Sequence, residues 1–301
     1  MIAITNARSI QPKIYSIIED IELHDIDILG VTEVWVKPNQ PLLEQSLEYI
    51  AQMKGFYYYS SGHRPRGKRG GGAAVIVSAS KFQTTKLDIH VPSNLEVIWT
   101  RLRPKAVSKN DLYKEFIVCV FYSPPRKGKN QALIDYLSEN VHVLITKHNK
   151  AGFFLMGDKN SMDIVQLTRN LPNFRQTVSR PTHNNKILDV IIMNSFQHYA
   201  VPVILPSPRP DNPLTHKRSD HMYAKAIPLD RSDDPRTREY RIKINRPMPE
   251  SSRKVFGQML LQVDWSQVYN ATESTNKVKV MDEMINDMID IAFPIVRTKN
   301  I

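Results

Sequence analysis

The stretch Leu155–Asp163, LMGDKNSMD, decides how the rest of this chain is interpreted. An apolar run ends there on a carboxylate, Asp158, and an amide, Asn160, which are two positions apart. Side chains two residues apart in an extended backbone point to the same side. The pattern therefore predicts a strand whose tip carries both groups, as in many hydrolytic sites. The same letters are also typical of an ordinary turn, in which Asp and Asn bond their own backbone.

Polar clusters lie at the ends of several other apolar runs, which favours the first interpretation. Buried strands of a sheet read as apolar runs bounded by polar or turn-forming residues. The clusters are Asn6-Ala7-Arg8-Ser9 after Ile2–Thr5, Thr32-Glu33-Val34-Trp35 after Ile26–Val31, Tyr122-Ser123-Pro124-Pro125 after Phe116–Phe121, Asp189 inside Ile187–Met193, and Ser219-Asp220-His221 before Met222–Ile227.

The composition indicates a globular protein with a basic surface. The 301 residues are 41% hydrophobic and 24% charged, which is enough to bury a full-sized core. A formal net charge of +11 favours a polyanionic partner, either nucleic acid or an acidic membrane surface. Charge alone does not choose between these two, and a basic surface that is merely solvated is the third reading.

Cysteine usage and hydropathy exclude several classes of protein. Cys119 is the single cysteine, so an internal disulfide and a cysteine-rich zinc module are excluded. Its place in the apolar run FIVCVF predicts a buried, inert thiol. We find no apolar run of the roughly 18 residues that a membrane span needs, and residues 1–10 lack the layout of a signal peptide. We therefore expect an intracellular protein that is not secreted and has no membrane partner.

The apolar runs and two helical patterns predict the fold class. Ile14, Ile17, Ile18 and Ile21 share one helix face, as do Leu133, Leu137, Val141 and Leu144. Many strands with interspersed helices predict two packed β-sheets flanked by helices. The expected strands are Ala73–Val77, Leu95–Leu102, Phe116–Phe121, Gly152–Met156, Leu188–Met193 and Val201–Leu205.

The chain changes character after Pro228, so we predict domains at 1–228 and 229–301. Residues 231–254 hold eight Arg or Lys, four acids and three prolines, which is typical of a mobile basic linker. A helix is expected to follow, closed by Pro294, with an apolar face made of Met281, Met284, Ile285, Met288, Ile289 and Ala292.

Taken in order, the polar clusters resemble the endonuclease/exonuclease/phosphatase superfamily, and most closely the apurinic-endonuclease-like domain of non-LTR (LINE-type) retrotransposons. The resemblance covers about residues 1–228, and it implies a DNase I-like four-layer α/β sandwich. The C-terminal part resembles the segment that leads into a reverse transcriptase in such elements. Besides the clusters above, the matching pieces are Gly70-Gly71-Gly72, Gly157-Asp158-Lys159-Asn160 and Arg180-Pro181-Thr182-His183 with Leu188-Asp189.

The resemblance also implies a catalytic set for phosphodiester hydrolysis. Such cleavage needs a positioned water, a base or metal to activate it, and donors for the charge that accumulates on the phosphate. A strand-end carboxylate such as Glu33 suits Mg²⁺ (or Mn²⁺), which takes few protein ligands. Without the surrounding pattern, Glu33 would be interpreted as an exposed, solvated acid. The implied catalytic residues are Asn6, Glu33, Tyr122, Asp158, Asn160, Asp189, Asp220 and His221, of which Glu33, Asn6 and Asp220 are the candidate metal ligands.

The roles within this set follow the chemistry of each side chain. By analogy with the family, Asp158 orients or deprotonates the water while Asn160 holds the phosphate or the water. Tyr122 donates to the phosphate, as does His221, whose pKa a carboxylate on its other nitrogen would raise. By the same analogy that carboxylate is Asp189, and Asp220 lies nearer the metal.

Basic and polar residues beside these clusters are candidate DNA contacts that set affinity without reading sequence. Each of them taken singly is equally well read as a solvated surface charge. The candidates are Arg8, Arg64, Arg66, Lys68, Arg69, Arg126, Lys127, Arg180 and Thr182.

Two features argue against an intact enzyme. Lys159 replaces the apolar residue usual between the Asp and the Asn of this motif, and alternation would point its ammonium into the layer beneath, at a cost. The first strand begins at Ile2, which we expect to trim its pairing at a sheet edge.

Three functions follow from these observations. The leading hypothesis is a Mg²⁺-dependent endonuclease that nicks double-stranded DNA in the nucleus, so that the 3′ hydroxyl primes reverse transcription. Element RNA and a reverse transcriptase domain are then further partners. The alternatives are a catalytically decayed DNA-binding remnant, and a lipid or inositol phosphodiesterase of the same fold.

Overall fold

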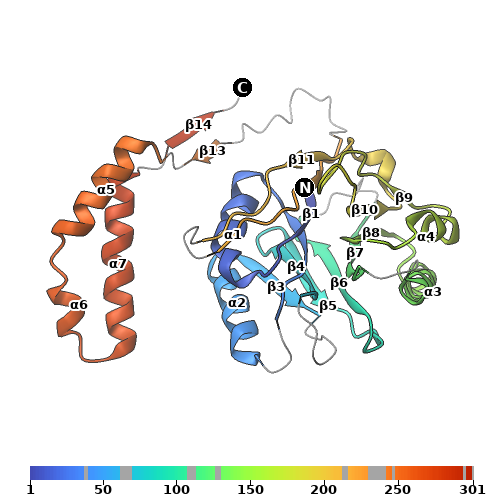
Figure 1. The fold of residues 1–301 in the computed structure, drawn as a ribbon, viewed down its shortest axis with the longest axis horizontal. Helices are drawn as coiled ribbons and strands as arrows, with labels where there is room; N and C mark the ends of the chain where they lie inside the picture. Colours follow the sequence, from blue (N-terminus) through green and yellow to red (C-terminus); the bar gives the residue numbers. More distant parts are fainter. Residues whose placement is uncertain are drawn as a thin grey trace. The chain divides into compact units, whose positions relative to one another are not determined.

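The structure is a computed structural model that describes residues 1–36, 40–61, 70–106, 113–125, 130–211, 216–229, 242–245, 248–293 and 296–299. The chain divides into two compact units, Met1–Leu229 and Asp230–Ile301, and each is described by itself. Figure 1 shows both units in ribbon form.

Among the described residues, the first unit contains two six-stranded sheets of mixed direction. The first sheet has the order β11 (Val203–Leu205), β12 (Tyr223–Ala226), β1 (Ile2–Asn6), β2 (Ile28–Thr32), β4 (Ala73–Ser78) and β3 (Phe56–Ser60). The second has the order β5 (Phe82–Lys86), β6 (Glu96–Pro104), β7 (Glu115–Tyr122), β8 (Ala151–Asp158), β10 (Asp189–Met193) and β9 (Arg175–Gln176).

Helices cover the outer face of each sheet, so the expected four-layer, DNase I-like sandwich is confirmed (Figure 1). The first sheet packs on α1 (Ile14–Leu23) and α2 (Pro41–Met53), and the second on α3 (Gln131–Lys147) and α4 (Ile164–Asn170). Both predicted apolar helix faces are buried against these sheets. Short 3-10 turns, η1 (Gln11–Lys13) and η2 (Phe196–His198), complete the unit.

The strands alternate between two cores, which is the feature that places the site. On β8, Phe153 and Leu155 face the helices, whereas Phe154 and Met156 face the other sheet. All four side chains are at most 1% exposed, and burial of each stabilises the fold by about 1.5–3 kcal/mol. The run at 116–121 alternates in the same way, so Cys119 is buried as predicted.

The two sheets approach closely at Gly30 on β2. A Cβ atom there would lie 2.8 Å from Cδ1 of Ile4 and 3.2 Å from atoms of Met156 and Val120. Only glycine leaves room for the side chains of the second sheet at this point. The strand β1 pairs with both β12 and β2, so the expectation of a trimmed edge strand is wrong.

The second unit consists of α5 (Glu250–Gln262), α6 (Ser266–Asn270), α7 (Ser274–Ala292), and a ribbon of β13 (Ile242–Asn245) with β14 (Val296–Lys299). The predicted helix over Met281–Ala292 is confirmed as the second half of α7, and Met288 is buried. The strand β13 and the start of α5 fall inside the segment expected to be a linker, so that part of the prediction is wrong. Residues 231–241 and 246–247 of that segment, and Pro294, lie outside the described residues.

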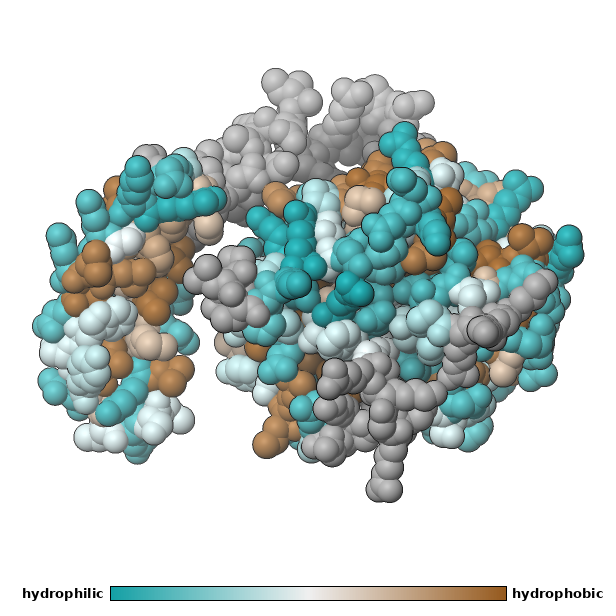
Figure 2. Space-filling model, viewed as in Figure 1, coloured by the Kyte–Doolittle hydropathy of each residue, from teal (hydrophilic) through white to brown (hydrophobic). Residues whose placement is uncertain are grey.

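The face of the molecule in Figure 2 is mainly hydrophilic, with small separate hydrophobic areas. Over the residues that the structure describes, none of the helices has the length and hydropathy of a membrane span.

Candidate active site

Four polar residues lie next to one another at one end of the second sheet. Glu96 pairs in register with Tyr122, Tyr122 with Asp158, and Asp158 with Asp189. Asp158 lies on the same strand face as Met156, which packs between the sheets. The alternation that fills the space between the sheets therefore also directs these polar groups to the rim of that space.

Asn6 ends β1 in the other sheet and links the two carboxylates that face it. Its Nδ2 donates to Oε1 of Glu33 at 2.9 Å and to Oδ2 of Asp158 at 3.0 Å. Its Oδ1 accepts from the backbone N–H of Arg8 at 2.9 Å, and its backbone carbonyl accepts from the Ser219 hydroxyl at 2.6 Å. Asn6 is fully buried, and three hydrogen bonds hold its side-chain amide in one orientation while the fourth fixes its backbone.

Glu33 occupies a strained backbone position directly after β2. Its φ is +53°, in the left-handed region that non-glycine residues rarely adopt, and such strain gathers at functional sites. Besides Asn6, its carboxylate accepts from the Tyr122 hydroxyl at 3.1 Å and from Nε1 of Trp35 at 3.1 Å. Three donors from three strand ends or loops therefore orient this carboxylate.

Tyr122 is placed to act as a hydrogen-bond donor. Burial raises the pKa of its hydroxyl well above the ordinary value, and the charges of Glu33 and Asp158 raise it further. The hydroxyl therefore keeps its proton at neutral pH, which a donor to a phosphate oxygen requires.

Asp158 is a buried carboxylate with a perturbed pKa. Its side chain accepts from Asn6 and from the backbone N–H of Asn160, yet the residue is 1% exposed. Burial first, and then the charge of Asp189, raise the pKa of Asp158 from 3.8 to about 7. A carboxylate with that pKa exchanges a proton readily near neutral pH, which suits a general base.

His221 and Asp189 form a hydrogen-bonded pair, as the sequence predicted. Nδ1 of His221 donates to Oδ2 of Asp189 at 2.8 Å. This contact does not use the other ring nitrogen, Nε2, which can therefore bind a different partner. Burial lowers the pKa of His221, but the hydrogen bond and charge of Asp189 outweigh it, so the net pKa is raised. The contact with Asp189 therefore favours the protonated form of His221 more than burial disfavours it.

Thr182 supports this pair from behind. Its hydroxyl accepts from the backbone N–H groups of Leu188 and Asp189 at 3.2 and 3.1 Å, and the residue is fully buried. The predicted contact between this side chain and DNA does not fit that burial. Thr182 instead holds the start of β10, which carries Asp189.

Asn160 reaches the site by a turn, not by extended strand geometry. The strand β8 ends at Asp158, and Asn160 has a φ of +40°. Its N–H donates to Oδ1 of Asp158 at 3.0 Å, and its Nδ2 donates to the carbonyl of Ser123 at 2.9 Å. The prediction from strand periodicity was therefore wrong for Asn160, and the turn interpretation was right for the local backbone.

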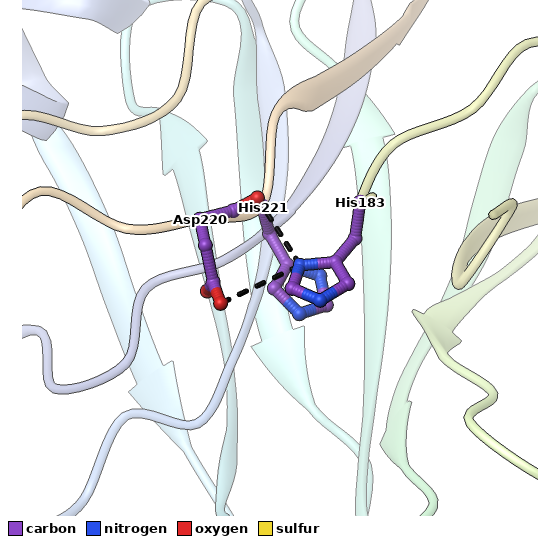
Figure 3. A group of neighbouring side chains, drawn as sticks. All are labelled: His183, Asp220 and His221. Carbon is purple, nitrogen blue, oxygen red and sulfur yellow. Dashed lines mark hydrogen bonds and ion pairs between the residues drawn. The ribbon is translucent and has the colours of Figure 1, made fainter. Parts of the chain in front are cut away.

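Asp220 faces a different set of partners from Glu33. Its carboxylate forms an ion pair with Arg8 at 2.9 Å and lies 3.6 Å from Nδ1 of His183. The His183 ring stacks on the His221 ring with centroids 4.4 Å apart (Figure 3). The position expected for Asp220, beside a metal on Glu33, stays a prediction.

The network therefore joins most of the predicted catalytic residues around one strand end. Of the predicted DNA contacts, Arg8 and Arg180 are exposed. Six others lie outside the described residues: Arg64, Arg66, Lys68, Arg69, Arg126 and Lys127.

A comparison with known protein families identifies the family to which this chain belongs. The profile of the Endonuclease/Exonuclease/phosphatase family matches residues 6–221, more than half of the chain. The match runs from the first residue of this network to the last. The chain belongs to the endonuclease/exonuclease/phosphatase family. Phosphodiester hydrolysis is therefore the general reaction that this family membership and these side chains support.

Solved structures of this family share the fold at low sequence identity. The endonuclease domain of TRAS1, a telomere-specific non-LTR retrotransposon, has 12% identity and a TM-score of 0.51, over 77% of this chain and all of that one. A mannosyl-6-phosphatase from Bacteroides thetaiotaomicron has 15% identity and a TM-score of 0.53, over 76% of this chain and all of that one. Among curated proteins none matches the chain significantly.

The carboxylates of the site fit a divalent cation. Asp158, Asp189 and His221 offer ligand atoms that lie within 4.8 Å of one another, and all three are buried. The pKa of Asp158 is raised, which indicates that the hydrogen bonds from Asn6 and Asn160 do not fully offset the cost of burying its negative charge. Asn6 presents its amide nitrogen, not its oxygen, to Glu33 and Asp158, so a role as a metal ligand would need a rotation of that amide.

Sequence reasoning missed Lys13, a buried cation that supports the site. The residue is 2% exposed, and its Nζ donates to the carbonyls of Arg8 at 3.1 Å and Ser9 at 3.2 Å. Both residues have positive φ, +45° and +80°. Lys13 therefore stabilises the strained turn whose N–H group orients Asn6. Its position directly before the buried face of α1 was the available signal.

Lys159 lines a pocket with the apolar residues Ile164, Phe174 and Ile187, as alternation predicts, but its ammonium is not without an acceptor. The residue is half-buried, and its Nζ contacts the carbonyl of Asn160 at 3.4 Å. Its backbone N–H donates to the carbonyl of Leu188 at 2.8 Å, which fixes the tip of β8 against the neighbouring segment.

A basic cavity lies beside the turn that follows Asn6. The residues that line it include five cationic or titratable side chains and one indole: Arg8, Lys13, His216, Lys217, Arg218 and Trp35. Trp35 also donates to Glu33, so this cavity adjoins the network.

Proposed function

We propose that this chain is a Mg²⁺-dependent endonuclease that nicks double-stranded DNA. The observation that carries the proposal is one hydrogen-bonded network in which Asn6 joins Glu33 to Asp158, while Asp189 orients His221 beside them. Mn²⁺ would satisfy the same oxygen ligands.

The reaction is hydrolysis of one phosphodiester bond. A water attacks phosphorus and gives its proton to Asp158, whose pKa of about 7 suits this exchange. The bond from phosphorus to the 3′ oxygen breaks, and that oxygen takes up a proton to become a 3′ hydroxyl. His221 and Tyr122 donate to the non-bridging oxygens, where negative charge accumulates. Glu33 would hold Mg²⁺, which when bound would supply positive charge for the same phosphate oxygens.

The surface chemistry supports DNA as the substrate. The chain carries a formal charge of +11, and the cavity beside Asn6 presents Arg8, Lys217 and Arg218. Arg180 adds an exposed charge two residues before the buried Thr182. Cations in such positions bind backbone phosphates in register without reading sequence. The fold that this chain shares with a retrotransposon endonuclease domain is consistent with that choice.

The biological setting we infer is a LINE-type retrotransposon. The nick would expose a 3′ hydroxyl from which a reverse transcriptase copies element RNA, and the work would take place in the nucleus. Residues 229–301 would then connect the nuclease to that polymerase.

A plasmid-nicking assay tests the proposal. Supercoiled plasmid is incubated with Mg²⁺ and the full chain, or with Glu33→Gln, His221→Ala, or the control Glu139→Gln, an exposed acid on α3. We expect open-circular product that a DNA polymerase extends from its 3′ end. The two site variants should lose at least about a hundredfold in rate, and the control should match the wild type.

Other results would decide against this function. Equal nicking by all four proteins would mean that the network does not carry the reaction. Plasmid binding without nicking would favour the decayed remnant. Release of a phosphorylated head group from inositol phospholipid vesicles, with intact plasmid, would favour the lipid phosphodiesterase.

A further inference from the structure

Two loops at the rim of the first unit bring together two imidazoles and a carboxylate. His183 lies in the loop between β9 and β10, and Asp220 and His221 directly precede β12. One ligand atom from each residue lies within 4.8 Å of the others. Figure 3 shows the two rings one over the other, with the carboxylate of Asp220 to one side.

The separations in this cluster are close to those of a tetrahedral metal site. Two ligand atoms that each bind zinc at about 2.0–2.1 Å lie about 3.3 Å apart. Nδ1 of His183 and Oδ2 of Asp220 are 3.6 Å apart. The carbonyl oxygen of Asp220 is also 3.2 Å from that nitrogen. Small rotations of the partly buried His183 and of the more exposed Asp220 would therefore complete the geometry.

Each imidazole already has an outer partner of the kind that metal-bound histidines use. Metal ligands commonly donate their other ring N–H to a carboxylate or an amide oxygen, which fixes the tautomer. Nδ1 of His221 is held by Asp189 at 2.8 Å, which leaves Nε2 for a cation. Nε2 of His183 lies 2.9 Å from the side-chain amide of Asn184, and its Nδ1 donates to the carbonyl oxygen of Asp220 at 3.2 Å, a hydrogen bond that a cation on Nδ1 would replace. Rotation of that exposed amide by half a turn presents its oxygen to the ring.

We propose that His183, Asp220 and His221 bind Zn²⁺, and that zinc at this site inhibits hydrolysis. Two imidazoles and one carboxylate form a donor set that suits borderline-soft Zn²⁺ and not Mg²⁺, which requires oxygen ligands. Bound zinc withdraws Nε2 of His221 from the phosphate. The inhibitory effect rests on the proposed nuclease function, whereas zinc binding does not.

Arg8 is the group that zinc must displace. Its guanidinium pairs with Oδ2 of Asp220 at 2.9 Å, and the Arg8 side chain is 53% exposed. An exposed ion pair of this kind is worth at most about 1 kcal/mol, so its loss is a small obstacle to metal binding.

Zinc binding can be measured directly. Zinc chloride is titrated calorimetrically into the full chain in excess Mg²⁺, with His183→Ala and the control His142→Ala, an exposed histidine on α3. Loss of an outer partner weakens metal binding by about 10–100-fold, so loss of a ligand should weaken zinc binding by at least about tenfold. We expect that loss in His183→Ala, and wild-type affinity in His142→Ala. The variant His183→Asn serves as a second test if the alanine protein does not fold.

The nicking assay then tests inhibition, with each protein compared with its own rate in Mg²⁺ alone. The zinc concentration that halves the rate should rise at least about tenfold in His183→Ala. Equal zinc affinity in the wild type and both His183 variants would overturn the site. Ligand-dependent zinc binding by a chain that never nicks DNA would keep the site and refute the proposed function. Nicking that zinc inhibits equally in all variants would refute inhibition through this cluster.

Discussion

Asp158→Asn should make the protein more stable while it abolishes activity. Above pH 7 the wild type holds a buried carboxylate whose pKa is raised from 3.8 to about 7. At about 1.4 kcal/mol per pH unit, that rise corresponds to about 4 kcal/mol of destabilisation. An amide has one acceptor oxygen for the two donors of Asn6 and Asn160, which costs about 1–3 kcal/mol. The expected net gain is about 2 kcal/mol at pH 8.

The pH dependence follows from the sign of this pKa change. The folded state keeps a proton on Asp158 that the unfolded chain loses, so the wild type loses stability as pH rises from about 4 to about 7. The variant lacks this loss. The free energy of unfolding of Asp158→Asn should be close to that of the wild type at pH 5 and exceed it by about 2 kcal/mol at pH 8. This difference corresponds to about 4–8 °C in melting temperature.

Thermal unfolding in EDTA between pH 5 and pH 8 provides the measurement. The control is Asp135→Asn, which removes an exposed carboxylate from α3 and should leave stability unchanged. Added Mg²⁺ should raise the melting temperature of the wild type more than that of Asp158→Asn, because the cation offsets the same buried charge. An Asp158→Asn protein that is no more stable than the wild type at pH 8 would refute the reasoning.

Three further predictions concern groups around the site. Lys13→Met should lower the nicking rate by about tenfold, equivalent to about 1.4 kcal/mol, because the carbonyls of Arg8 and Ser9 lose a charged donor; Lys13→Arg should recover part of the rate. Gly157→Ala should lower the free energy of unfolding by about 1–3 kcal/mol or more in chemical denaturation, since its Cβ would lie 2.1 Å from the carbonyl oxygen of Phe121. Asp189→Asn should lower the pKa of His221 in a histidine NMR titration, because the hydrogen bond and the charge of Asp189 are the largest effects that offset burial; an unchanged titration would contradict that pairing.

Much of the fold followed from local patterns in the sequence. Apolar alternation on the strands, and the threefold to fourfold spacing of Ile14, Ile17, Ile18 and Ile21, identified the layers. These patterns show which side chains are buried, and burial of apolar side chains is what forms the three hydrophobic clusters of this fold. The meeting of Asp189 with His221 was foreseen from strand ends and from the family resemblance together.

Other features depend on long-range geometry that local patterns do not contain. Asn160 adopts a left-handed backbone after β8, so alternation stops one residue earlier than the motif suggested. Thr182 resembles a surface residue in the sequence, yet it is buried, and its hydroxyl accepts hydrogen bonds from the backbone N–H groups of Leu188 and Asp189. The stacking of His183 on His221 joins two loops that are 38 positions apart, and no periodicity links them.

The shared alternation of core and site residues has a consequence for how the protein loses activity. Asn6 and Asp158 stand on opposing sheets, and each continues the row of side chains that packs those sheets together. A loosened state in which the sheets slide or separate cannot keep this pair in contact. Inactivation by heat or urea should coincide with the change in fluorescence of the buried Trp99, with no active intermediate between the native and unfolded forms.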